Sequence, residues 1–303
     1  MTEPKSFKDG KQWAWDSTSL SSAQTCLRKY QYEMIRRIQP RRTSVHLIFG
    51  GIYASALEAF YKYRAEGMDH EAALEATVRL TLEKSWNFED DKPVFFDDVK
   101  KTRPNLVRTV IWYIEQYGVE SDDGLVTYHL EDGKPAVELS FAIELDDDIV
   151  FCGHLDRVVQ LGDDLYIADQ KTTGGTISNY FFKQFDTSLQ MTGYAFAGKM
   201  VMKSPVRGVI IDGAQIAVNF TQFDRGITTR SQDQIEDWLK SVRHTIEGAW
   251  RAADEGYYPM NYTSCDKYGG CPFRQLCTSS KHVVENYIKS DFETRVWDPI
   301  VQR

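Results

Sequence analysis

The sequence predicts an α/β protein with a mixed central sheet flanked by helices, a helical N-terminal insertion and a cysteine-rich C-terminal closure. Apolar residues recur at helical spacing through the first part of the chain. Apolar and polar residues then alternate in short segments separated by turns, as in half-buried strands. Three cysteines lie close together near the end. We expect a single domain over residues 1–303, with a mostly helical part (17–130), a core (135–255) and a closure (257–280).

The N-terminal part carries the start and stop signals of helices. Ser17, Thr18 or Ser19 can cap the first helix, because each side chain accepts hydrogen bonds from free backbone amides. Gly67 suits the end of the second helix. The expected helices span residues 17–38, 47–66, 70–87 and 104–117.

The strands follow in the second half of the chain. Val137, Leu139 and Phe141 alternate with polar residues, and three consecutive aspartates after them suit a turn. The tail from residue 257 is expected to be irregular. The expected strands span residues 137–144, 149–160, 165–172 and 206–219, and the expected helices span 187–202 and 231–254.

Composition and charge exclude several classes of protein. The chain has 303 residues, of which 42% are hydrophobic and 26% charged, as in ordinary globular proteins. No apolar run is long enough for a transmembrane helix, and the N-terminus lacks the pattern of a secretory signal. We therefore expect a cytoplasmic protein without membrane contact or structural disulfides. The net charge of −8 argues against a protein that coats nucleic acid without specificity. A nuclease with a local basic surface for phosphates is compatible with this net charge.

The most informative residues lie in GHLDRVV (153–159) and YIADQKTT (166–173). Asp169 and Lys171 are two apart on a strand, so their side chains share one face, and a hairpin can bring Asp156 beside them. Two adjacent carboxylates repel unless a cation joins them, and their oxygens suit Mg²⁺ or Mn²⁺. Lys171 can then orient a water molecule or stabilise charge on a phosphate. The alternative is an exposed hairpin with a surface ion pair.

Further oxygen and nitrogen ligands lie nearby in the sequence. The backbone carbonyl of Gln170 can supply another oxygen, and Glu138 on the preceding strand is a possible outer carboxylate. His154 lies two residues before Asp156 on the same face of its strand, although a lone histidine there also fits a structural hydrogen bond.

These two segments resemble the nuclease core of the RecB-like PD-(D/E)xK superfamily, including the CRISPR-associated RecB-like exonucleases. The resemblance implies a restriction-endonuclease-like core and a Mg²⁺- or Mn²⁺-dependent exonuclease that hydrolyses phosphodiester bonds at DNA ends. It implies a prokaryotic or phage-encoded protein of recombination, repair, or phage or CRISPR DNA processing. The Gln-x-x-x-Tyr signature of the family reads Gln190-Met191-Thr192-Gly193-Tyr194 here, and the resemblance places Gln190 and Tyr194 at the active site.

One departure from the family pattern bears on the metal site. The family often carries a metal-binding histidine in a Gly-x-x-x-His-x-x-Leu-Glu stretch of the early helix. The matching stretch here runs from Gly50 to Glu58, with Ala54 at the histidine position. His154 can partly replace the lost nitrogen ligand. The departure keeps open a second interpretation, a catalytically weak or inactive DNA-binding accessory protein of recombination.

The cysteines suggest a metal or cluster site, because a reducing compartment disfavours disulfides. Four thiolates can hold a [4Fe–4S] cluster or a zinc ion. The cluster-bearing RecB-like and AddB-like relatives have one early and three late cysteines, so the resemblance implies a [4Fe–4S] cluster here. The spacing between the first two late cysteines is longer than in the family, which keeps zinc open. Cys152 is expected to be a buried small side chain. The four ligands are Cys26, Cys265, Cys271 and Cys277.

DNA is the expected partner, and basic residues are candidates for its phosphates. A dense basic stretch lies in the N-terminal part of the chain, and a smaller one contains Lys100, Lys101 and Arg103. The alternative interpretation of these two stretches is a solvated helix face and a loop. The oligomeric state, the digestion polarity and the strand preference do not follow from the sequence. The dense basic stretch contains Arg28, Lys29, Arg36, Arg37, Arg41 and Arg42.

Overall fold

The chain divides into two compact units, each assembled from segments that lie far apart in the sequence. Unit 1 comprises the described residues of 1–43, 140–153 and 231–302, and unit 2 comprises those of 44–139 and 154–230. The computed structural model describes residues 5–42, 44–95, 98–119, 124–295 and 297–301.

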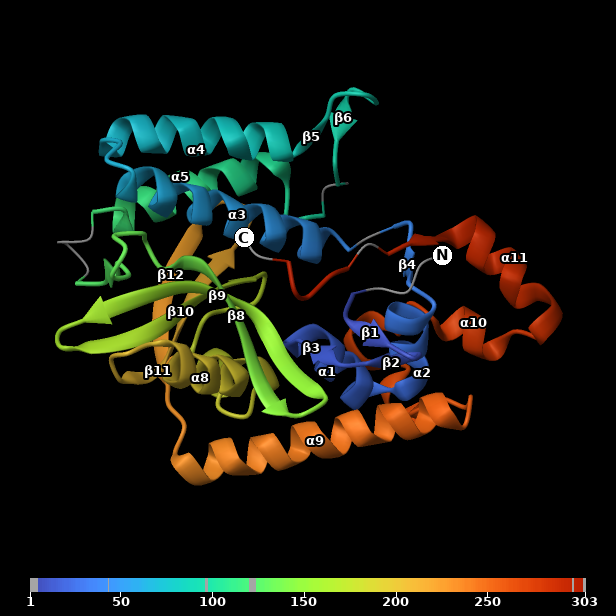
Figure 1. Cartoon of the computed structure of the whole chain (residues 1–303). Coiled ribbons are helices and arrows are strands. Elements are labelled where there is room, and N and C mark those ends of the chain that lie inside the picture. Colours follow the sequence, from blue (N-terminus) through green and yellow to red (C-terminus); the bar gives the residue numbers. More distant parts are fainter. Residues whose placement is uncertain (1–4, 43, 96–97, 120–123, 296, 302–303) are drawn as a thin grey trace. The chain divides into compact units, whose positions relative to one another are not determined.

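Unit 2 is built on a mixed sheet in which the strand order is β12–β11–β10–β9 (Figure 1). β10 (Asp164–Thr173) pairs parallel with β11 (Val206–Ile216), and β11 pairs antiparallel with β12 (Thr221–Thr228). The second half of β9 (Ile149–Leu161) pairs antiparallel with β10. The short strand β7 (Val126–Thr127) pairs with β9. The predicted hairpin of strands and the later strand over 206–219 are therefore confirmed.

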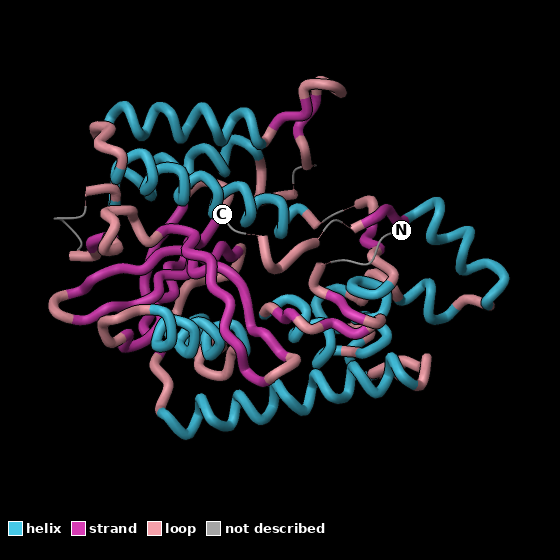
Figure 2. Tube along the Cα trace, in the orientation of Figure 1, coloured by secondary structure: helices cyan, strands magenta, loops and turns pink. Residues whose placement is uncertain are grey.

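Helices cover both faces of this sheet (Figures 1 and 2). On one face α3 (Val45–Ala65) contacts β10, and α5 (Arg103–Tyr117) contacts β11 and β12. α4 (His70–Lys84) packs against α3 and α5. On the other face α8 (Leu189–Val201) contacts β10 and β11. This mixed α/β sandwich is the predicted fold class.

The core between α3, α5 and the sheet is rich in aromatic side chains. Tyr53 of α3 and Tyr113 of α5 are almost fully buried, and their rings meet edge to face with centroids 6.0 Å apart. Phe49, Leu57 and Phe60 of α3 are completely buried in the same cluster. Burial of each such side chain contributes roughly 1.5–3 kcal/mol, so the cluster fixes α3 firmly on the sheet.

Unit 1 is mainly helical. α1 begins at the Asp16 cap, and α9 begins at a Ser231–Gln234 capping box. A second apolar cluster contains Tyr32, Phe273 and Phe292. β8 (Val137–Asp146) pairs with β9 and has residues in both units. Other elements are β1 (Phe7–Lys8), β2 (Lys11–Gln12), β3 (Ala14–Trp15), α1 (Ser17–Thr25), β4 (Ile38–Pro40), β5 (Trp86–Asn87), β6 (Lys92–Pro93), α7 (Asn179–Lys183), α9 (Gln232–Asp254), α10 (Arg274–Thr278) and β13 (Phe292–Thr294).

The continuous helix predicted over 17–38 is wrong. Cys26 has extended backbone angles (φ −171°, ψ 120°), and the chain resumes as α2 (Leu27–Tyr30) followed by a π-helical turn over Gln31–Ile35. Contacts with the tail replace helical hydrogen bonds here. The amide of Arg28 donates to the carbonyl of Pro259 over 3.1 Å.

The irregular tail predicted from residue 257 is also partly wrong, because α11 (Lys281–Asp291) is helical. Val284, Tyr287 and Ile288 recur at spacings of three and four residues and pack on the cluster around Phe273. Within the described residues, none of the helices combines the length and the apolar character that crossing a membrane requires.

Candidate active site

The two aspartates of the predicted site face each other where the β9–β10 ladder ends. The antiparallel register runs from Leu161 opposite Asp164 to Arg157 opposite Ala168. The next residues along the two strands are Asp156 and Asp169. Facing residues of an antiparallel pair hold their Cβ atoms about 4.5–5.5 Å apart. β10 continues beside β11 beyond this point, so Asp169 stays on a paired strand.

Burial and mutual repulsion dominate the electrostatics of this pair. Burial, then the neighbouring Asp169 carboxylate, raises the pKa of Asp156 to about 8. Burial also raises the pKa of the fully buried Asp169, although the nearby Lys171 ammonium opposes this shift. Without a further cation, burial and repulsion therefore disfavour the simultaneous ionisation of the two carboxyl groups.

Lys171, Tyr194 and Gln190 complete a chain of contacts around the pair. The Lys171 ammonium forms an ion pair with the Asp169 carboxylate. The Tyr194 hydroxyl donates to Asp156 Oδ1 over 3.3 Å, and Gln190 Nε2 donates to the Tyr194 hydroxyl over 3.1 Å. Burial raises the pKa of Tyr194 well above its usual value, so its phenol remains a donor. The structure thus brings together the residues that the sequence proposed as catalytic.

A narrow cavity opens between these residues and α3. Its volume is about 10 Å³, close to the space one water molecule needs. Ala54 and Glu58 of α3 line it together with Glu138 and Asp156. Ala54 is therefore on the wall of the candidate site, at the position where the family often carries histidine. Glu138, which lines the cavity, has a left-handed backbone (φ 52°), a strained conformation for a residue with a side chain.

Gln170 and His154 occupy different places around the pair. The backbone N–H of Gln170 donates to the Asp156 carboxylate, and the Gln170 side chain lines the narrow cavity. His154 is half-buried on β9, two residues before Asp156. Their predicted roles as metal ligands stay predictions.

Sequence reasoning missed a set of buried charged and polar residues beneath the site. The Arg157 guanidinium is 3% exposed and lies 3.7 Å from the centroid of the Tyr61 ring. Asp212 on β11 accepts a hydrogen bond from Tyr113 and pairs with Arg225, with Arg225 Nε 3.3 Å from Asp212 Oδ1. Charged residues inside the apolar segments HLDRVV and VIIDGA were the available signal, because a buried charge requires a partner.

The donor set fits a hard divalent ion. Apart from the contacts with Lys171 and Asp156, neither carboxylate oxygen of Asp169 accepts a hydrogen bond from the described residues. Mg²⁺ commonly takes one or two carboxylates and keeps several waters. Among the described residues, no three His, Cys, Asp or Glu side chains stand close enough to surround one ion.

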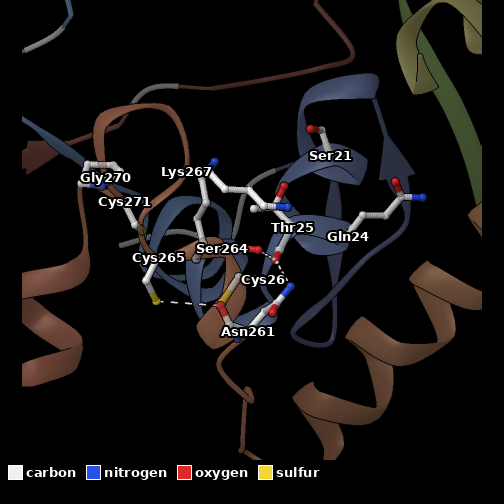
Figure 3. Close-up of a pocket in the computed structure, with 12 residues that line it drawn as sticks. Ser21, Gln24, Thr25, Cys26, Asn261, Ser264, Cys265, Lys267, Gly270 and Cys271 are labelled. Carbon is white, nitrogen blue, oxygen red and sulfur yellow. Dashed lines mark hydrogen bonds between the residues drawn. The ribbon is translucent and has the colours of Figure 1, made fainter. Parts of the chain in front are cut away.

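Three of the four predicted cluster ligands line one cavity of about 610 Å³ in unit 1 (Figure 3). These are Cys26, Cys265 and Cys271. The amide of Asn261 donates to Cys26 Sγ over 3.2 Å, which ties the early cysteine to the tail. Burial is the main cause that raises the pKa of Cys277, and the thiols of Cys271 and Cys26 add to the shift. The four thiols therefore lie in one region of unit 1, but among the described residues no three of them stand close enough to surround one ion.

Cys152 lies apart from this set, as expected. It is 1% exposed, and burial raises the pKa of its thiol to about 12. An inert thiol of this kind is a packing residue.

The dense basic stretch makes many contacts within unit 1. Arg28 and Arg41 donate to backbone oxygens of the tail over 2.8 and 3.2 Å. Lys29 and Arg36 pair with glutamates at 3.8 and 2.7 Å, and Arg42 is exposed. Several of these donors are therefore engaged in holding the unit together, and their role toward DNA stays a prediction.

Comparisons with known proteins bear on the fold and the family. A family model described as the PD-(D/E)XK nuclease superfamily matches residues 15–278. The chain is similar to the crystal structure of a "Putative exonuclease" from Eubacterium rectale, with a TM-score of 0.51 and 11% sequence identity. That match covers 83% of this chain and 85% of the other, and at this identity it shows the fold alone. No curated protein gives a significant match.

Proposed function

Because this chain belongs to the PD-(D/E)XK nuclease superfamily, we propose that it is a Mg²⁺- or Mn²⁺-dependent DNA exonuclease that hydrolyses phosphodiester bonds at DNA ends. The observation that carries the proposal is the pair of facing aspartates, Asp156 and Asp169, beside the Lys171 ammonium. A pair whose pKa values are raised by burial and repulsion gains most from a divalent cation. The family supports DNA as the substrate, and the RecB-like branch and its roles in recombination, repair, or phage or CRISPR processing belong to the proposal.

The metal ligands in this proposal are the carboxylates of Asp156 and Asp169 and the backbone carbonyl of Gln170. Glu138 and His154 are outer candidates, since both lie near Asp156 along the strands. The bound ion would polarise the phosphate and favour hydroxide near neutral pH.

The surrounding side chains have separate roles. Lys171 orients the attacking water and stabilises the negative charge that grows on the phosphate. Tyr194 holds Asp156 through its hydroxyl, and Gln190 fixes the Tyr194 hydroxyl. Gln190 and Tyr194 lie one helical turn apart on the same face of α8, and the buried Tyr194 acts on the site through Asp156.

The four thiols of Cys26, Cys265, Cys271 and Cys277 are proposed to hold a [4Fe–4S] cluster, with zinc as the alternative. Burial raises the pKa values of Cys271 and Cys277, and the positive charges of Lys29 and Arg28, respectively, oppose these shifts. Positive charge at this position favours thiolates, which both kinds of site require. Absorption near 400 nm from anaerobically purified protein would separate the cluster from zinc.

Digestion of end-labelled DNA tests the proposed nuclease. Linear DNA with free ends and covalently closed circular DNA are incubated with Mn²⁺, Mg²⁺ or EDTA. We expect metal-dependent loss of the linear substrate only. Asp169→Asn keeps the side-chain shape but removes the charge, and it should lower the rate by roughly a thousandfold or more. If the closed circle is cleaved at the same rate as the linear DNA, the protein is an endonuclease and the proposed exonuclease activity is wrong.

Ala54 favours a second candidate, a catalytically weak or inactive DNA-binding accessory protein. The residue lies on the cavity wall beside Asp156, so the site lacks the nitrogen ligand that many relatives supply from this helix. DNA binding without metal-dependent cleavage of any linear or single-stranded substrate would favour this candidate.

A further inference from the structure

We propose that the exposed ring of Tyr180 stacks on an unpaired base of the DNA beside the candidate active site, which makes single-stranded DNA the preferred substrate. This inference rests on the proposed nuclease function and names its substrate class. Tyr180 lies on α7 and is 86% exposed. Single exposed aromatic residues are common on protein surfaces, so the place of this ring in the fold decides its meaning.

α7 lies on the sheet face that carries the catalytic lysine. The β10–β11 register pairs Lys171 with Gly213, and paired residues on neighbouring strands point to the same face about 4.8 Å apart. A Cβ atom on Gly213 would be 3.1 Å from Phe181 and 3.2 Å from Ile177. Phe181 therefore lies over that face, one strand away from Lys171. Tyr180 directly precedes Phe181 in the helix.

Aromatic packing fixes the short helix and leaves Tyr180 outside it. Phe181 meets Phe182 and Phe185 edge to face, with ring centroids 5.2 and 5.4 Å apart. Phe182 lies directly over Gly226, whose missing side chain makes room for the ring. The amide of Ile177 donates to Gln215 Oε1 over 2.8 Å and anchors the preceding loop. These contacts fix the backbone that carries Tyr180, which limits the ordering cost when a base stacks on its ring.

Positive charge accompanies the ring at the same end of β10. Lys100 is exposed, and its ammonium donates to the carbonyl of Gly174, just after the strand. Lys101 is buried and donates to Thr172 Oγ1 over 3.2 Å, so it braces the loop that presents Lys100. An exposed cation for phosphates and an aromatic platform for bases, both near the same end of β10, form a combination that binds single strands.

The pairing state of the DNA follows from this geometry. A base inside a duplex is already covered by its neighbours on both faces, so the Tyr180 ring has no free surface to contact. An unpaired base offers its face, and stacking on an aromatic side chain contributes about 1–3 kcal/mol per base. This corresponds to roughly 5- to 150-fold in affinity.

Binding without cleavage provides the first test. Fluorescence anisotropy of labelled oligo(dT) is measured in EDTA with the full chain, and a labelled blunt hairpin duplex serves for comparison. We expect Tyr180→Ala to weaken oligo(dT) binding roughly 5- to 150-fold and to leave duplex binding unchanged. Tyr180→Phe should bind like the parent, because the ring face is retained. Phe88→Ala is the matched control, since Phe88 is 74% exposed on the loop between β5 and β6 and should have no effect.

Several results would overturn the inference. These are parental oligo(dT) affinity in Tyr180→Ala, an equal loss in Phe88→Ala, or a parent that binds the duplex at least as tightly as oligo(dT). The nuclease proposal stands or falls separately, by the Mn²⁺-dependent cleavage of DNA ends. If the parent cleaves nothing but Tyr180→Ala still loses oligo(dT) affinity, the binding surface is supported and the nuclease is not. If the parent cleaves but the variant binds normally, the nuclease is supported and the stacking role is not.

Discussion

The two aspartates of unit 2 lie close to each other, and the four thiols of unit 1 lie in one region of that unit. The two sets differ in how far apart their members are in the sequence. Asp156 and Asp169 belong to one hairpin, and the strand register alone makes them face each other. Cys26 comes from the beginning of the chain and Cys265, Cys271 and Cys277 from its end. Their proximity depends on contacts such as the hydrogen bond from Asn261 to Cys26.

Because of this difference, we expect changes to the carboxylate pair and to the thiols to affect different properties of the protein. A local pair of carboxylates forms whenever the hairpin forms, and repulsion between its members destabilises the metal-free fold. The thiol set closes a loop that includes most of the chain, so whatever binds it restricts the unfolded chain. Loss of a carboxylate should therefore impair catalysis, whereas loss of a thiol should impair folding.

The largest stability effect is expected from Cys26→Ala. If Cys26 holds the proposed cluster or zinc ion, its loss should lower the free energy of unfolding by on the order of 4 kcal/mol, by analogy with disulfides that close long loops. Urea denaturation of anaerobically purified protein measures it. Cys152→Ala is the control, because Cys152 is buried but lies outside the thiol set, and its cost should be about 1 kcal/mol. Equal urea midpoints for Cys26→Ala and the parent would show that the thiols do not close the chain.

The next effect concerns pH. The pKa of Asp156 is about 8 in the metal-free fold and about 3.9 in an unfolded chain. Below about pH 4 the Asp156 carboxyl is protonated in both the folded and the unfolded protein. As the pH rises, this carboxyl ionises readily in the unfolded chain, whereas its ionisation in the folded protein is opposed by burial and by Asp169. The metal-free protein should therefore lose stability from about pH 4 to about pH 8.

Asp156→Asn isolates this contribution, because the amide cannot titrate. Urea midpoints measured across the same pH range should fall less steeply in the variant than in the parent. Saturating Mg²⁺ should reduce the slope of the parent in the same direction, since the ion stabilises the ionised pair. Parallel curves for parent and variant would mean that Asp156 does not carry the shifted pKa.

The site was predictable where its geometry is local. A strand alternates its faces every residue, so Asp169 and Lys171 had to share a face, and a short turn was enough to bring Asp156 opposite. Gln190 and Tyr194 had to share a helical face for the same kind of reason. These placements need no knowledge of the rest of the chain.

Other features depended on partners distant in sequence. The break at Cys26 follows from hydrogen bonds to residues of the tail, which helical propensity does not report. Arg157 and Asp212 read as single charges in apolar strands, and only the fold reveals Tyr61, Tyr113 and Arg225 around them. The left-handed backbone of Glu138 likewise carries no sequence signal, because its residue type is not one that favours it.

The smallest expected effect comes from Ala54→His, which asks whether the carboxylate pair lacks a ligand. An imidazole at the cavity wall beside Asp156 should tighten Mn²⁺ binding by about tenfold, because it adds one ligand to the ion. The gain is modest because Mn²⁺ prefers oxygen ligands to nitrogen. The cavity of about 10 Å³ is smaller than the ring, so the metal-free variant should lose about 1–3 kcal/mol through crowding. Calorimetric titration measures the Mn²⁺ affinity, and urea denaturation without metal measures the loss of stability.

Ala54→Leu is the control for this variant. It adds similar bulk without a nitrogen, and it should show the loss of stability alone. If the histidine and leucine variants bind Mn²⁺ equally, α3 does not contribute to the metal shell, and the carboxylate pair is complete without it.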